Sequence, residues 1–179
     1  MSFSPILIVA GEPNSIFIEI FFKVFKIKKI KSPIILISSK KLLKFQMKKF
    51  KFKKNINVLE LSKLDYRNLN NNSINLIDVQ YDSIDVFKKI TKKSNAYNKK
   101  SFEIAFKILR QGKIKKFING PISKSKFLND KFLGITEYIS KAFSKKHTCM
   151  LIYNKTLSVC PVTTHLPLKL VSKQINKEN

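Results

Sequence analysis

Three short strings between residues 120 and 168 have residue types and spacing that could carry chemistry. They are Gly120–Lys124 (Gly-Pro-Ile-Ser-Lys), Gly134–Glu137 (Gly-Ile-Thr-Glu) and Thr163–Leu168 (Thr-Thr-His-Leu-Pro-Leu). The chain contains only four glycines, so a glycine followed at once by proline, or one just before Thr-Glu, indicates a requirement of the backbone. We interpret the three strings as parts of one site.

His165 is the residue best suited to chemistry, because it follows an apolar run and stands between two threonines and a proline. A neutral imidazole there could bind a divalent metal ion or transfer a proton, with Thr163 or Thr164 orienting the ring. It could equally cap the next helix or hydrogen-bond to a loop. No His-x-x-x-His pattern or carboxylate cluster accompanies it, and His147 follows two lysines and is expected at the surface. A metal bound by His165 would therefore need ligands from elsewhere.

Three further polar residues each have a functional and a structural interpretation. Lys124 could approach a phosphate or carboxylate together with the amides of a helix start, or could be an ordinary exposed lysine. Thr136, followed by Glu137, could hydrogen-bond to a substrate or begin a helix. Glu12 could be a carboxylate in a cleft or stabilise a turn. The sequence has no Gly-x-Gly-x-x-Gly and no Walker loop, so its pattern does not identify a nucleotide.

The charge balance is strongly basic, with 36 Lys and Arg against 11 Asp and Glu and a formal net charge of +25. Clustered cations of this kind are typical of proteins that bind nucleic acid or anionic membranes. Only Arg67 and Arg110 are arginines, however, and the lysines are spread over the whole chain. Because readers of phosphates and base edges favour the planar guanidinium, we expect solvated faces and no specific nucleic-acid partner.

Membrane and redox features are sparse. The apolar runs Ile6–Ala10 and Pro33–Ile37 are far shorter than the ~20 residues of a bilayer-spanning helix, and no positively charged leader precedes the first. We therefore expect no membrane segment and a cytosolic location. Cys149 and Cys160 lie in apolar, strand-like runs without a Cys-x-x-Cys pattern, so we expect buried reduced thiols in preference to a disulfide or a metal pair.

The elements that must position these residues alternate between strands and helices. Apolar runs predict strands at Ile6–Ala10, Pro33–Ser38, Ile56–Leu61, Ile74–Val79, Phe117–Asn119, Cys149–Tyr153 and Leu157–Val162. Helical spacing predicts helices after Ser15, at Ser39–Phe50, at Ser94–Gln111 before Gly112, at Thr136–Phe143 and at Leu166–Ile175. This alternation, in a chain of 179 residues, predicts one α/β domain.

The predicted strands also explain why the strings could meet. In an open α/β sheet ligands gather at the carboxyl ends of strands, where Gly11-Glu12-Pro13, Gly120 and Thr163 are all expected. In the first helix we expect Ser15 to be the cap and Ile16, Ile20 and Val24 to share a face.

Four strings together resemble the family of 4-hydroxythreonine-4-phosphate dehydrogenases, the NAD-dependent enzymes of pyridoxal phosphate biosynthesis. Gly11-Glu12-Pro13, with Glu19, is similar to the family's opening Gly-Asp/Glu-Pro-Ala-Gly-Ile-Gly-Pro-Glu. Asn119–Lys124 is similar to Thr-Gly-Pro-Ile-x-Lys, and Gly134–Glu137 to Gly-His-Thr-Glu. Thr163–Leu168 matches Thr-Thr-His-x-Pro-Leu without a change.

The resemblance implies the two-domain α/β architecture of isocitrate and isopropylmalate dehydrogenases, in a homodimer with its active site in a cleft. It implies oxidation of 4-phosphohydroxy-L-threonine by NAD, followed by loss of carbon dioxide. A divalent metal ion such as Zn²⁺, Mg²⁺ or Co²⁺ would polarise the reacting oxygen. By the same resemblance His165 is a metal-ligand position and Thr136 a substrate-binding position. From its place four residues after Gly120, we also expect Lys124 to bind the substrate.

The chain departs from the family pattern in three ways. Ile135 stands where the family has a substrate-binding histidine, and Ser15 and Phe17 replace two glycines. Family members are also about twice as long, so the resemblance implies that 1–175 form the amino-terminal α/β portion, that 176–179 are a polar tail, and that the carboxyl-terminal half is absent. That half would contribute two further metal-binding histidines and most contacts to NAD and phosphate.

Three hypotheses follow from the sequence. The first is a truncated or split member of the family, active with a second polypeptide that supplies the carboxyl-terminal half. The second is a non-catalytic descendant, which Ile135 and the missing glycines favour. The third is a basic module that binds nucleic acid, which rests on charge alone.

Overall fold

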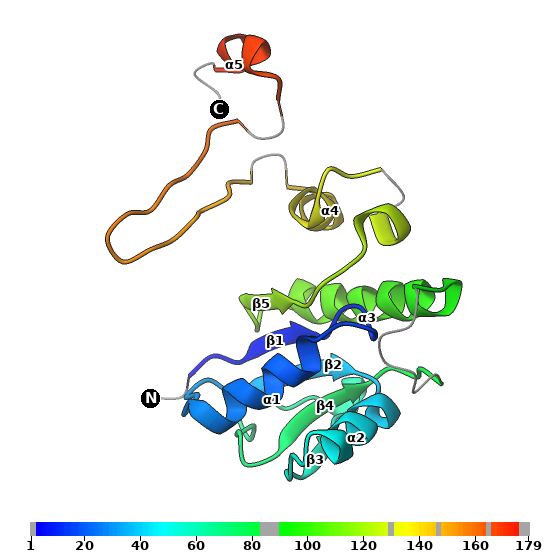
Figure 1. Cartoon of the computed structure of the whole chain (residues 1–179). Helices are drawn as coiled ribbons and strands as arrows, with labels where there is room; N and C mark the ends of the chain where they lie inside the picture. The colour runs from blue at the N-terminus through cyan, green and yellow to red at the C-terminus, as the bar shows by residue number, and fades with distance from the viewer. Residues whose placement is uncertain (1–2, 83–89, 129–130, 146–147, 164–165, 176–179) are drawn as a thin grey trace. The chain divides into compact units, whose positions relative to one another are not determined.

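The computed structural model describes residues 3–82, 90–128, 131–145, 148–163 and 166–175 (Figure 1). The chain forms two compact units, Met1–Phe127 and Leu128–Asn179, and each is described by itself. Across the described residues, none of the helices is long and apolar enough to cross a membrane.

The first unit contains a five-stranded sheet in which every neighbouring pair is parallel. Its strand order is β3-β4-β2-β1-β5. The strands are β1 (Ile6–Val9), β2 (Ile34–Ser38), β3 (Ile56–Val58), β4 (Ile74–Asp78) and β5 (Lys116–Asn119). The α/β fold predicted from the alternating pattern is therefore confirmed, because parallel neighbours require crossovers, and α1, α2 and α3 supply three of them.

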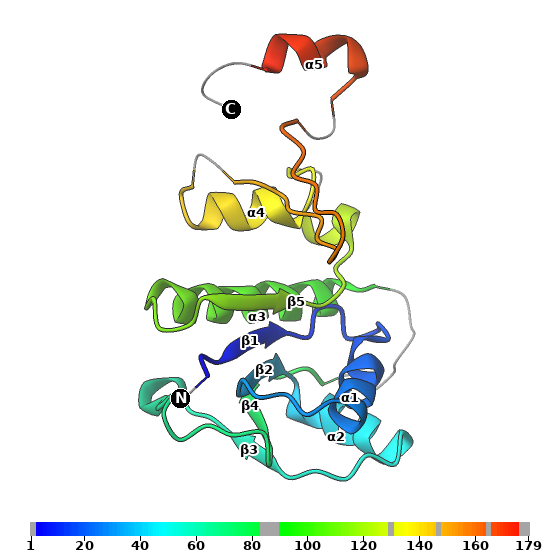
Figure 2. The ribbon, with the colours of Figure 1, turned by 90° about the vertical axis from the view of Figure 1, so that its left-hand side faces the viewer.

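Helices cover both faces of this sheet (Figures 1 and 2). One core cluster joins α1 (Phe17–Ile27) and α2 (Lys40–Lys49) to alternate strand residues such as Ile8 and Leu36. The intervening residues, such as Leu7, are also fully buried, and α3 (Lys92–Arg110) contacts β1 and β2. Burial on both faces explains why the central strands are continuous apolar runs.

The first helix differs from its prediction in its cap, while Ile16, Ile20 and Val24 share a face as predicted. Its N-cap is Ile16, while the Ser15 hydroxyl accepts a hydrogen bond from the Phe17 amide at 3.3 Å. The face shared by Ile16, Ile20 and Val24 is the exposed one, and the buried residues are Ile18, Phe21 and Phe22. The helix is apolar at almost every position, so spacing alone could not decide which face packs on the sheet.

The third helix agrees with its prediction more closely. Thr91 caps it and forms a reciprocal pair of hydrogen bonds with Ser94, each at 3.1 Å. Gly112 follows the helix with φ +73°, which is the left-handed conformation expected of the glycine that ends it.

The asparagine-rich loop before β4 has a structural role of its own. The Asn71 side chain accepts a hydrogen bond from the Ile34 amide at 2.9 Å. It also donates to the carbonyl oxygens of Ile30 at 2.9 Å and Ser32 at 2.8 Å. One side-chain amide therefore pairs with three backbone groups at the entry to β2. Leaving these backbone groups unpaired would cost free energy of folding.

The second unit contains α4 (Ile135–Ala142) and α5 (Leu168–Gln174), near the predicted helices. Of the two strands predicted there, the structure has a single antiparallel bridge between Ile152 and Val159. The prediction that Cys149 and Cys160 are buried is wrong, since both are exposed free thiols. The apolar runs that suggested burial have no packed layer over them within the described part of this unit.

The close approach of β1 and β5 predicts a steric difference between two glycines. A Cβ atom at Gly120 would overlap the carbonyl oxygen of Ala10 and lie 2.6 Å from its carbonyl carbon, whereas one at Gly112 meets nothing within 4 Å. We expect Gly120→Ala to lower the free energy of unfolding by about 3 kcal/mol. Gly112→Ala should lower it by about 1 kcal/mol, from its positive φ alone. Urea unfolding followed by circular dichroism measures both, and equal losses would contradict the steric account.

Candidate functional site

Two of the predicted motif ends meet at the carboxyl edge of the sheet. Gly11 follows β1 and Gly120 follows β5, which is its parallel neighbour. The Gly120 amide donates to the Val9 carbonyl at 2.7 Å, and the Glu12 amide donates to the Pro121 carbonyl at 2.7 Å. Gly11 has φ +74°, and a Cβ atom there would overlap the Pro121 oxygen. Both glycines are therefore required by the backbone, which the sequence predicted for Gly120 but not for Gly11. Gly134, the other predicted position, is extended with φ −165° and meets only the Glu137 side chain.

Glu12 lies buried directly after this crossing, with 7% of its surface exposed. Its Oε2 accepts a hydrogen bond of 2.8 Å from the side-chain amide of Asn98, which is fully buried on α3. The Oε1 atom of Glu12 and the Oδ1 atom of Asn98 have no hydrogen-bond partner among the described residues. The edge of the sheet thus holds a buried carboxylate whose one observed donor is an uncharged amide.

This pair has a defined chemical capacity. Two buried oxygens without donors can accept hydrogen bonds from an ammonium or hydroxyl group, and a carboxylate in such a place favours a cationic partner. Sequence reasoning assigned Glu12 to a cleft or a turn but missed Asn98. The available signal was an amide-bearing residue in the middle of a strong helix, a position where asparagine is intrinsically disfavoured.

A second buried polar group comes from the same helix. The Tyr97 hydroxyl accepts a hydrogen bond from the Ser39 amide at 3.2 Å and donates to the Ser38 hydroxyl at 3.4 Å. Burial raises the pKa of Tyr97 above its ordinary value, so the phenol stays protonated in the folded chain. Two neighbouring side chains of α3, Tyr97 and Asn98, therefore contact residues at the ends of β2 and β1.

Phe17 narrows the space beside the glycine crossing. A Cβ atom built on Gly120 would lie 3.1 Å from the Cγ atom of the Phe17 side chain. The sequence identifies Phe17 as a replacement for a family glycine, and the structure shows that its ring fills the space next to the Gly120 backbone. A ligand could not approach the backbone there without moving this ring.

Lys124 begins a short π-helical turn, η2 (Lys124–Leu128), and its side chain is exposed. The turn is attached to α3 by a hydrogen bond of 2.8 Å from the Asn95 side chain to the Lys126 carbonyl. The structure therefore fixes the backbone after Gly120 and leaves the lysine ammonium accessible to an anion.

The remaining predicted site residues belong to the second unit. Thr136 is exposed in the first turn of α4, directly after Ile135, and Glu137 is the acidic residue of that turn. Thr163 is half-buried, and His165, Thr164 and His147 lie outside the described residues. Within the described ranges no three His, Cys, Asp or Glu side chains form a group that could hold a metal ion.

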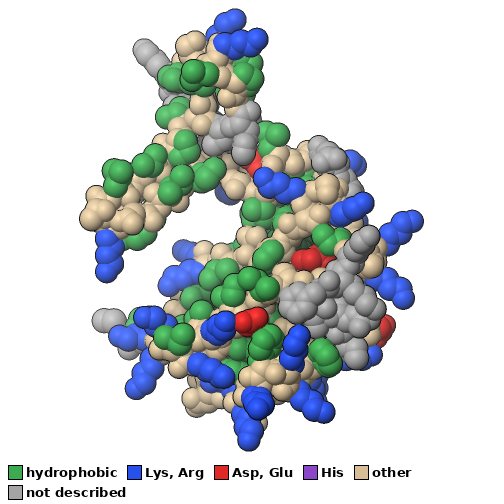
Figure 3. Space-filling model, viewed as in Figure 1, with side chains coloured by type: hydrophobic (Ala, Val, Ile, Leu, Met, Phe, Trp, Pro, Cys, Tyr) green, Lys and Arg blue, Asp and Glu red, His purple; other side chains and the backbone are tan. Residues whose placement is uncertain are grey.

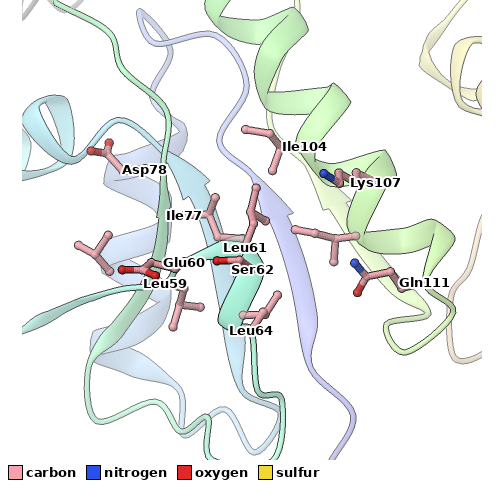
Figure 4. A pocket seen from close by; sticks show the side chains of 12 residues that line it. Leu59, Glu60, Leu61, Ser62, Leu64, Ile77, Asp78, Ile104, Lys107 and Gln111 are labelled. Carbon is pink, nitrogen blue, oxygen red and sulfur yellow. The ribbon is translucent and has the colours of Figure 1, made fainter.

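A pocket of about 700 Å³ lies elsewhere in the first unit. Figure 4 shows it between α3, which contributes Ile104 and Lys107, and the segment after β3, which contributes Leu61. None of the residues predicted from the motifs lines it. The candidate site is therefore defined by the strand ends, and this pocket is a separate feature of the first unit.

Comparisons with known proteins agree with the motifs. The profile of the family described as pyridoxal phosphate biosynthetic protein PdxA matches residues 29–179. A 4-hydroxythreonine-4-phosphate dehydrogenase from Sulfurihydrogenibium sp. is 31% identical over 96% of this chain and 52% of its own length. One from Aquifex aeolicus is 36% identical over 38% of this chain and 22% of its own. The chain therefore spans about half the length of the relative that it matches throughout.

Solved structures show the same fold at lower identity. A 4-hydroxythreonine-4-phosphate dehydrogenase from Burkholderia phymatum superposes with a TM-score of 0.77 at 19% identity, covering 92% of this chain and 51% of that one. Another, from Klebsiella pneumoniae, gives a TM-score of 0.76 at 15% identity, covering 98% of this chain and 55% of that one.

The Glu12–Asn98 contact predicts unequal losses of stability from two substitutions. Asn98→Ala removes the only observed donor to a buried carboxylate and should lower the free energy of unfolding by about 3 kcal/mol. Glu12→Gln removes the charge and can donate to the Asn98 oxygen, so we expect a change within about 1 kcal/mol. Urea unfolding of both variants measures this. A Glu12→Gln variant as damaged as Asn98→Ala would contradict this account of the contact.

Proposed function

Because the chain belongs to the PdxA family of pyridoxal phosphate biosynthetic proteins, we propose that it takes part in the NAD-dependent oxidation and decarboxylation of 4-phosphohydroxy-L-threonine. The observation that carries the proposal is the family match over residues 29–179 together with the meeting of Gly11 and Gly120 at one sheet edge. A soluble, cytosolic homodimer related to isocitrate dehydrogenases is part of the same proposal.

The chain's own residues would act on the substrate in three ways. Lys124 presents an exposed ammonium that would neutralise the phosphate. Thr136 presents a hydroxyl in the first turn of α4, where free backbone amides favour an anion. The backbone crossing of Gly11 and Gly120 would hold the loop that leads to Lys124 in one conformation.

A divalent metal ion, when bound, supplies Lewis-acid stabilisation of negative charge on oxygen. His165 is the proposed ligand from this chain, and the described residues do not complete a ligand set. They also contain no glycine-rich dinucleotide loop. We therefore propose that the remaining metal ligands and most NAD contacts come from residues equivalent to the half of the relatives that this chain does not span.

A second candidate function is that of a non-catalytic homologue. Two observations favour it: Ile135 can neither donate nor accept a hydrogen bond where the family has histidine, and Phe17 fills the space beside Gly120. The nucleic-acid hypothesis has no comparable support, since on the face drawn in Figure 3 the Lys and Arg side chains are scattered and do not gather in one groove.

Activity tests the proposal directly. We expect the chain alone, given substrate, NAD and Mn²⁺ or Zn²⁺, to form no NADH, and the chain combined with the carboxyl-terminal half of the Sulfurihydrogenibium relative to form it. His165→Ala should then lower kcat/KM about 100-fold, the effect of losing several kcal/mol of metal-assisted stabilisation. His147→Ala is the matched control and should leave the rate unchanged. Absorbance at 340 nm measures turnover, and NADH formation by the chain alone would contradict the half-site proposal.

Ile135 separates the catalytic from the non-catalytic candidate. In the combined protein, Ile135→His restores a hydrogen-bond donor that can reach a charged substrate, which is worth about 10-fold or more in kcat/KM. Ile139→His, one turn along α4, is the control and should give no gain. No activity in any of these proteins would favour the non-catalytic homologue.

A further inference from the structure

A short hairpin in the second unit has an unusual surface. The Ile152 amide donates to the Val159 carbonyl at 2.8 Å, and the Val159 amide donates back to the Ile152 carbonyl at 2.9 Å. The Asn154 amide donates to the Leu157 carbonyl at 3.1 Å, which closes the turn. These bonds set an antiparallel register for residues 149–162, which we call the hairpin.

Both faces of the hairpin are mostly apolar, with Asn154 on one face and Ser158 on the other. If the register continues, Met150, Ile152, Leu157 and Val159 lie on one face, and Leu151, Tyr153, Cys160 and Val162 on the other. The exposed fractions are 60% for Ile152, 68% for Leu157 and 60% for Leu151. A hairpin with one solvated face alternates apolar and polar residues, so this pattern is typical of strands covered on both sides. Figure 3 shows the hydrophobic side chains gathered along it.

Charge is almost absent from the hairpin. Its only charged residue is Lys155, at the turn, in a chain whose net charge is +25. Depletion of charged residues is the compositional mark of the buried centre of an interface. Within the described part of the second unit no third strand pairs with the hairpin, so its outer backbone groups are also open to a partner strand.

We propose that the hairpin is the docking surface for the polypeptide equivalent to the half of the PdxA relatives that this chain does not span. The inference rests on the proposed function, because it identifies where that half attaches, whether it continues the same chain or is a separate one. The Sulfurihydrogenibium relative is matched over 52% of its length, which leaves nearly as much sequence again to form a covering layer.

A second copy of this chain is a poorer occupant. Two hairpins related by a two-fold axis cover one face or one edge of each other and leave the opposite apolar face exposed. The equivalent of the missing half can cover both faces and add strands to the edges, which is how an extended segment joins an existing sheet.

The two native cysteines report on docking without added labels. Cys149 and Cys160 are both exposed in the hairpin and are the only cysteines in the chain. Local desolvation, and then the adjacent Cys149 thiol, raise the pKa of Cys160, so their alkylation rates should be compared at one fixed pH.

The experiment mixes the full chain with the carboxyl-terminal half of the Sulfurihydrogenibium relative. We expect a one-to-one complex by analytical ultracentrifugation and at least a 10-fold slower alkylation of both thiols by iodoacetamide, followed by mass spectrometry. Ile152→Lys with Val159→Lys should weaken binding about 30-fold or more, because it places charges at a buried apolar centre. Ile27→Lys, at an exposed apolar position in the first unit, is the control and should bind normally.

A fusion of the chain to the same half, as one polypeptide, guards against poor folding of the separate fragment. Thiols that stay fully reactive in the fusion, or a complex that the double lysine variant does not weaken, would overturn the inference. So would thiol protection in the chain alone by self-association, which would assign the hairpin to a second copy. Docking without NADH formation would refute the proposed function alone, and NADH formation with unprotected thiols would refute the docking surface alone.

Discussion

The contact between the backbones of β1 and β5, where both strands end, is the constraint on which the candidate site depends. Gly11 and Gly120 pass each other so closely that a methyl group on either would overlap a carbonyl oxygen. The hydrogen bonds on both sides of the crossing hold the two loops at one edge of the sheet. Because the loop after Gly120 leads to Lys124, the direction in which that lysine leaves the sheet is set by this contact.

The same crossing explains why a carboxylate is buried in so basic a protein. Glu12 follows Gly11 and turns inward, where α3 meets the sheet and Asn98 donates a hydrogen bond to it. Many lysines lie at the surface, yet none forms an ion pair with Glu12 in the described residues. Burying a carboxylate without a counter-charge costs free energy of folding. Proteins tolerate such a cost mainly at functional sites that use the charge.

The two units contrast in how their apolar residues are covered. In the first unit helices bury both faces of the sheet, so its core is complete. In the second unit the hairpin exposes large apolar side chains on both faces, and α4 has no fully buried residue. A layer of secondary structure needs another layer against it. The strings that resemble the family are divided between a unit that satisfies this rule and one that does not.

The sequence by itself determined the five strands of the first unit, most helix ends, the requirement for glycine at position 120 and the family. These follow from local rules. Continuous apolar runs predict covered strands, and Ser39 and Gly112 mark helix ends. The order of the family's strings can be read directly from the sequence. The sequence alone failed where the burial of a side chain depends on residues that are distant in the chain. Cys149 and Cys160 are exposed although they lie in apolar runs, and the face shared by Ile16, Ile20 and Val24 is the exposed one. An apolar pattern does not specify which of its residues a neighbouring layer covers. Only the tertiary structure brought Asn98 to Glu12, since residues 86 positions apart meet through packing that no local pattern encodes.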